Sequence, residues 1–205
     1  MHTLATAAAL AVALAAVPAD AQTADTKVAK PGTQAVPGAP AADQANATDR
    51  VFVELVGTSG KAEVEFARLA DRKAQNGGVK DFAHRMADDH TKTNEQLAMR
   101  AQGANISVPQ EPGPDHKTML AQLERATGPA FDLAYIQGQI AGHQKMIALM
   151  EYEIDSGQNA ALKQFASETL PTILRHLDSA KDVMADLARQ GVVLAASDSA
   201  RDSSR

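Results

Sequence analysis

Four long stretches of the chain place apolar residues three or four positions apart, the spacing that gathers them on one face of a helix. These stretches span residues 48–75, 79–102, 129–156 and 158–190. In the third stretch, the apolar stripe consists of Ile136, Ile140, Ile147, Met150 and Ile154. A shorter pattern predicts a helix over Asp115–Ala126, ended by the Gly128-Pro129 break. Together these patterns predict an all-α protein with four long helices and one short helix.

The connections between the predicted helices indicate how the chain is arranged. Asn76-Gly77-Gly78 and Ser156-Gly157-Gln158 are short turn signals. The first two long helices should therefore form one antiparallel pair, and the last two another. Residues 103–128, by contrast, are long enough to cross the length of a bundle, and they include the short helix. We therefore expect a ferritin-like four-helix bundle, with a long crossover carrying a short helix between long helices 2 and 3.

The first 21 residues, 1–21, have the pattern of a signal peptide. Leu4–Val17 is an Ala/Leu/Val run of the expected length, and Ala19-Asp20-Ala21 supplies small residues before a cleavage point, although Met1-His2-Thr3 lacks a Lys or Arg. The run is shorter than the ~20 residues that a membrane-spanning helix needs. We therefore expect export, a periplasmic or secreted location, and no transmembrane span after cleavage.

The remainder of the chain divides into a linker, a domain and a tail. Residues 22–47 are rich in Ala, Pro and Gly without apolar periodicity, which predicts a disordered linker. Residues 48–190 are the predicted folded domain, with Thr48 or Asp49 as the N-cap of its first helix. The polar residues 191–205 are predicted to form a disordered tail.

Composition narrows the classes of function. The 205 residues carry a net charge of -5 and no cluster of Lys and Arg, which argues against nucleic acid as a partner. There is no cysteine, so disulfides, thiolate metal ligands and cysteine nucleophiles are excluded. No nucleophile–base pair indicates a hydrolase or a transferase, so an enzyme is the least supported class.

Three of the six histidines stand out, because each lies on the apolar face of a different predicted helix, near its middle. They are His90, His143 and His176. Residues at helix midpoints share one layer of a bundle whichever way each helix runs. Glu63 has the corresponding position on the first long helix, at the flank of its apolar stripe. The spacing therefore predicts a layer of three imidazoles with a carboxylate beside it.

Two interpretations of this layer remain open. In the first, the rings form a hydrogen-bonded polar layer in the core of a structural, stress-related or interaction protein, whose partner would be another envelope protein. The alternative is a metal-binding or redox protein, because imidazoles with a carboxylate suit a transition metal ion such as zinc, iron or copper. The candidate ligands are then His90, His143, His176 and Glu63. A carboxylate-bridged di-iron centre is disfavoured, because it needs Glu three residues before His on two helices. The residues at those positions here are Ala87, Ile140 and Ile173.

Three separated segments resemble the bacterial family DUF4142, a domain of unknown function whose exported members are often labelled outer membrane proteins. The segments are Phe66–Leu97, Phe131–Glu151 and Phe165–Lys181. The resemblance covers residues 48–189 and implies a ferritin-like fold, a periplasmic or envelope location and no established activity. The family pattern includes the three core histidines, but Gly142 stands where an acidic residue commonly precedes the second of them.

Overall fold

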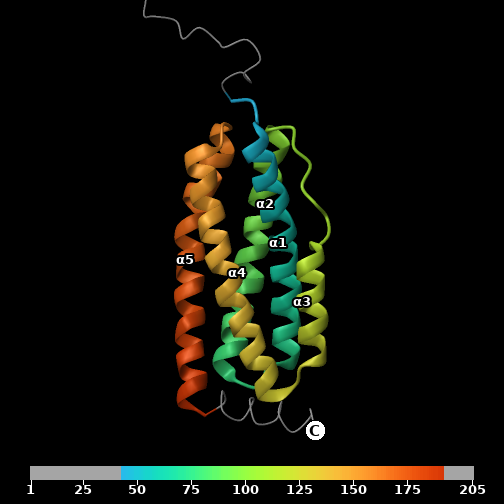
Figure 1. Ribbon diagram of the computed structural model, residues 1–205, viewed down its shortest axis with the longest axis vertical. Helices are drawn as coiled ribbons and strands as arrows, with labels where there is room; N and C mark the ends of the chain where they lie inside the picture. Colours follow the sequence, from blue (N-terminus) through green and yellow to red (C-terminus); the bar gives the residue numbers. More distant parts are fainter. Residues whose placement is uncertain (1–42, 192–205) are drawn as a thin grey trace, which may run out of the picture. The chain divides into compact units, whose positions relative to one another are not determined.

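The computed structural model describes residues 43–191 of the protein. Over this range the chain forms five α-helices and no strand, which confirms the predicted all-α class (Figure 1). The helices are α1 (Ala47–Lys73), α2 (Gly77–Gly103), α3 (Pro114–Arg125), α4 (Gly128–Ser156) and α5 (Ala160–Arg189). The predicted signal peptide, most of the linker and the polar tail lie outside the described residues.

The four long helices pack as two antiparallel hairpins, α1–α2 and α4–α5 (Figure 1). α1 contacts α2 and α4, and α5 contacts the same two helices, so α1 and α5 occupy opposite corners of the bundle. α2 and α4 run in the same direction, because the connection that carries α3 leads the chain back along α1 (Figure 1). The predicted crossover with its short helix is therefore present. Within residues 43–191, no helix combines the length and apolarity needed to cross a membrane.

The first helix begins earlier than the sequence suggested, because its N-cap is Asn46 rather than Thr48 or Asp49. The Asn46 side chain accepts a hydrogen bond from the backbone N–H of Asp49 at 2.9 Å. In return, the Asp49 carboxylate accepts one from the backbone N–H of Asn46 at 2.6 Å. This reciprocal pair is a capping box. The predicted N-cap was wrong because Asp49 lies inside the first turn, as the partner of the cap.

Each tight turn is fastened by a buried aspartate from the other hairpin. Asp49 of α1 accepts the backbone N–H of Asn159, just before α5, at 3.0 Å. Asp132 of α4 accepts the backbone N–H of Asn76, just before α2, at 2.9 Å. A carboxylate at a helix N-terminus is favoured by the unpaired N–H groups and by the helix dipole. The two aspartates therefore join the hairpins at opposite ends of the bundle.

The apolar core consists of two clusters. Members of the first include Phe66, Phe82, Phe131 and Tyr135. Members of the second include Phe52, Leu97, Met150 and Phe165. Along α2, α4 and α5 the three candidate histidines fall between the residues of the two clusters. A polar layer thus interrupts a core whose stability comes mainly from buried apolar surface.

Candidate metal centre

His90 of α2, His143 of α4 and His176 of α5 converge in the middle of the bundle. Their ring centroids are 5.7 Å apart for His90 and His143, 5.5 Å for His90 and His176, and 5.4 Å for His143 and His176. Each ring offers one nitrogen such that the three nitrogens lie within 4.8 Å of one another. The rings face inward because of the helical period of their apolar stripes. They share one depth because each lies near the midpoint of its helix, as the sequence indicated.

Each of the three rings has a buried nitrogen without a hydrogen-bond partner among residues 43–191. These atoms are Nε2 of His90, Nε2 of His143 and Nδ1 of His176. The three residues are only 6%, 2% and 6% exposed, so bulk water does not reach the cluster freely. Buried polar atoms are ordinarily paired, so three unpaired nitrogens in one layer make this cluster the candidate metal site.

Hydrogen bonds on the outer side orient two of the rings. Nδ1 of His143 donates to the backbone carbonyl of Gln139 at 2.8 Å. Nε2 of His176 donates to a carboxylate oxygen of Asp89 at 2.9 Å. Because these acceptors hold the single proton of a neutral imidazole on the outer nitrogen, the inner nitrogen presents its lone pair to the cluster. Metal-binding histidines are oriented in this way, by a carboxylate or a carbonyl behind the ring.

The surroundings favour neutral rings. Burial lowers the pKa of His90 well below its ordinary value, and the neighbouring His143 and His176 lower it further. Burial also lowers the pKa of His176, although its hydrogen bond to Asp89 acts in the opposite direction. Since a metal ion binds the unprotonated ring, protons compete little for these two ligands near neutral pH.

Glu63, the fourth candidate ligand, lies beside the cluster but outside the group of converging ligand atoms. It is only 5% exposed, and its Oε2 accepts a hydrogen bond from the side-chain amide of Gln139 at 2.6 Å. A Cβ atom at Gly142 would lie 3.5 Å from Oε1 of Glu63, which places this carboxylate against the residue before His143. An acidic residue at position 142 would thus face Glu63 with like charge. Because residue 142 is glycine, the Glu63 carboxylate can lie against the backbone of α4.

The sequence indicated Asp89 as a carboxylate at the flank of its apolar stripe, but it assigned neither Asp89 nor Gln139 to the ring that it orients. Gln139 precedes His143 by one helical turn, so its carbonyl lies within reach of the ring, and its side chain holds Glu63 as well. Asp89 precedes His90 in the chain, but its carboxylate accepts a hydrogen bond from His176 on α5. The first relationship is local, because any residue one helical turn before a histidine offers its backbone carbonyl to the ring. The second depends on how α2 packs against α5.

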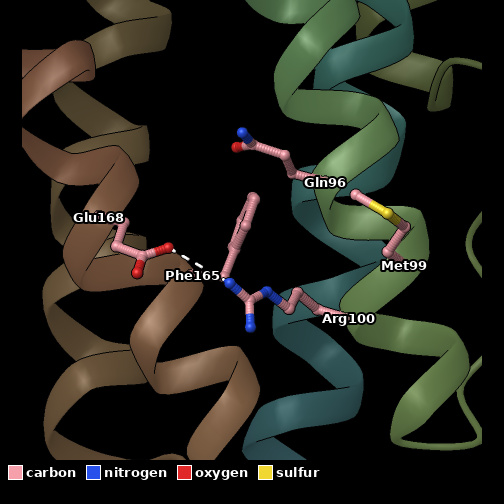
Figure 2. Close-up of a pocket in the computed structure, with 5 residues that line it drawn as sticks. All are labelled: Gln96, Met99, Arg100, Phe165 and Glu168. Atoms are coloured by element: carbon pink, nitrogen blue, oxygen red, sulfur yellow. Dashed lines mark hydrogen bonds and ion pairs between the residues drawn. The ribbon is translucent and has the colours of Figure 1, made fainter.

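A larger pocket of about 430 Å³ lies between α2 and α5, away from the histidines (Figure 2). Its lining residues are Gln96, Met99, Arg100, Phe165 and Glu168. Arg100 and Glu168 form an ion pair across it at 3.4 Å, as the dashed line in Figure 2 shows. Arg100 is half-buried, Glu168 is exposed and Met99 is 64% exposed, so the pocket is an open surface groove. The groove has the larger volume, but the unpaired buried ring nitrogens lie in the core. The core is therefore the candidate functional site.

Comparisons with known proteins agree with the helical fold. No functionally curated protein matches the chain. A crystal structure of a DUF305 fragment from Deinococcus radiodurans matches with a TM-score of 0.63 and 14% sequence identity, covering 70% of this chain and 99% of that one. A likeness at this identity concerns the fold alone. The sequence profile of DUF4142, a domain of unknown function, matches residues 34–183, which include all three core histidines, and the chain belongs to that family.

Proposed function

We propose that this protein is an exported metal-binding protein that holds one transition metal ion between His90, His143 and His176. The observation that supports this proposal is that three converging rings each have a buried nitrogen without a hydrogen-bond partner within residues 43–191. A layer that served only to stabilise the core would pair them, because an unpaired buried polar group costs about 1–3 kcal/mol. A metal ion accepts a lone pair from all three at once.

The donor set narrows the choice of metal. Imidazole nitrogen suits zinc, iron and copper, whereas magnesium and calcium prefer oxygen ligands. In a tetrahedral zinc site, Zn–N distances of about 2.0–2.1 Å place neighbouring nitrogens about 3.3 Å apart. The three nitrogens here lie within 4.8 Å of one another, so they would close by no more than about 1.5 Å. Small rotations of the rings are sufficient for that.

Metal content measured on the untagged full chain tests the proposal. The protein is stripped with a chelator and dialysed against zinc(II), copper(II) or iron(II), and bound metal is counted by elemental analysis. We expect one ion per chain for at least one metal, and loss of that ion in His143→Ala. His84→Ala is the matched control, because His84 is an exposed histidine of α2 that pairs with Asp71.

Two results would overturn the metal-binding proposal. One is metal content far below one ion per chain with every metal offered. The other is equal metal content in His143→Ala and the parent protein. Either result would favour the alternative, in which the histidine layer is a polar core element of a structural or interaction protein.

The export part of the proposal rests on Leu4–Val17 and the small residues before Gln22. Fractionation of cells that produce the full chain, followed by N-terminal sequencing, tests it directly. We expect the protein outside the cytoplasm with Gln22 as its first residue. Cytoplasmic protein that retains Met1 would contradict export and leave the metal site to be judged separately.

A further inference from the structure

A small cavity adjoins the histidine layer, and residues of all four long helices line it. His90 forms part of its wall, together with Ser59, Gly60, Thr93, Asn94 and Met146. The cavity offers about 10 Å³ to a water-sized sphere, which is roughly the room that one water molecule requires. Ser59, Thr93 and Asn94 are half-buried, so this wall reaches towards the surface between α1 and α2.

A glycine shapes the edge of the cavity. The side-chain amide of Asn94 donates to the backbone carbonyl of Gly60 at 2.9 Å. A Cβ atom at residue 60 would lie only 1.9 Å from Oδ1 of Asn94, so a side chain there would displace the amide. Glycine at this position therefore allows the side-chain amide of Asn94 to pack against the backbone of α1, beside the cavity.

Three protein ligands leave a four-coordinate metal ion with one further position. The converging group contains no carboxylate and the chain contains no cysteine, so the ligands supplied by the protein are uncharged. The carboxylates of Glu63 and Asp89 lie near the cluster but outside the converging group, so a divalent ion held by three neutral rings keeps its charge at the fourth position and attracts a small anion there. The cavity beside His90 has room for a ligand of the size of water and polar groups along one wall.

We infer that the metal ion keeps its fourth position for a small exogenous ligand, water at rest and exchangeable for a small anion, which reaches it through the cavity bounded by Ser59, Gly60, Thr93 and Asn94. This inference rests on the proposed function, because it requires the ion to be bound. Its rival is the thioether of Met146, which lines the same cavity three residues after His143 and would fill the fourth position from within the protein.

The test uses the full chain loaded with cobalt(II), whose visible absorption reports its coordination. The protein is titrated with sodium azide, with sodium perchlorate at matched ionic strength as the control. We expect a saturable change in the cobalt bands with azide and none with perchlorate. Met146→Leu should leave the resting spectrum unchanged, because water rather than the thioether occupies the fourth position.

A variant that narrows the cavity gives an independent measurement. Ser59→Val adds bulk to a space that admits about one water molecule, so we expect azide affinity to fall at least tenfold with cobalt stoichiometry unchanged. Thr58→Val is the matched control on the same turn, because the Thr58 hydroxyl bonds to carbonyls of its own helix and the residue does not line the cavity.

The outcomes separate this inference from the proposed function. Failure to bind cobalt or any other ion overturns both. Stoichiometric cobalt whose spectrum ignores azide overturns the exchangeable position alone. The exchangeable position is also overturned if Met146→Leu alters the resting spectrum while azide does not, because the thioether then occupies the fourth position. An equal loss of azide affinity in Ser59→Val and Thr58→Val contradicts the cavity as the route.

Discussion

The carboxylate of Asp49, in the first turn of α1, accepts the backbone N–H of Asn159, which lies 110 residues later at the N-cap of α5. The same carboxylate accepts the backbone N–H of Asn46. Asp49 is fully buried, so water cannot replace it as the acceptor for these groups. One side chain therefore fixes the start of the first helix to the start of the last.

Asp49→Ala is expected to lower the free energy of unfolding by roughly 2–4 kcal/mol, because it leaves the buried N–H of Asn159 without an acceptor and removes one of the two bonds of the capping box. Urea unfolding followed by circular dichroism measures this loss. Asp155→Ala, on the exposed face of α4, is the control and should change the free energy of unfolding by less than about 0.5 kcal/mol. Equal effects in the two variants would show that the Asp49 contact contributes nothing specific.

A second buried carboxyl group, Glu153, adds a dependence on pH. Burial, together with the neighbouring Asp49 carboxylate, raises its pKa from 4.5 to about 8. Between these two pH values the folded protein retains a proton that the unfolded chain releases. The contribution of this proton to stability is therefore complete below pH 4.5 and is lost as the pH rises towards 8.

Glu153→Gln is expected to remove this part of the pH dependence, because the amide is uncharged throughout the range. Between pH 4.5 and pH 8 the free energy of unfolding of the parent protein should fall relative to that of the variant, by roughly 2–4 kcal/mol. Urea midpoints measured at intervals across that window check the prediction. Parallel curves for the two proteins would mean that Glu153 is ionised in the folded state throughout.

His90→Leu is expected to separate the stability of the metal-free protein from metal binding. In chelator, the variant should melt at or above the temperature of the parent protein, because leucine replaces a buried ring whose Nε2 has no partner within residues 43–191. With a saturating metal ion, the parent protein should gain thermal stability and the variant should not. Differential scanning calorimetry with and without metal provides both comparisons. A large loss of stability in chelator would instead show that His90 pairs within the metal-free core.

Asp89→Asn is expected to weaken metal binding by about 10–100-fold while leaving one ion per chain, because Asp89 orients His176 and makes its ring more basic. Asp88→Asn is a closely matched control, one position earlier in α2 on an exposed face. Competition with a chromophoric chelator gives both dissociation constants. Equal metal affinities in the two variants would show that Asp89 does not support metal binding.

The helices and the histidine layer were predictable because both depend on spacing within a single helix. Apolar periodicity determined which face is buried, and position along the helix determined the depth of His90, His143 and His176 in the bundle. Neither argument needed to know which helices are neighbours. That is why these features could be derived without any information on packing.

The features that the sequence did not reveal depend on contacts between helices. Glu63 has the depth of a ligand, yet the amide of Gln139 holds it beside the cluster. The position of a side chain at the flank of a stripe depends on the rotation of its helix, and that rotation is decided by packing. Likewise, Asp49 of α1 lies near Glu153 at the end of α4, and no local sequence pattern predicts this contact.

The aspartates at the two turns also make the hairpins depend on each other. Asp49 of the first hairpin supports the start of α5, and Asp132 of the second supports the start of α2. A chain cut within the crossover would give two fragments, each lacking the acceptor for one of its own helix starts. We therefore expect the bundle to assemble and unfold in a single cooperative step, and to be rebuilt from its two halves only when both are present.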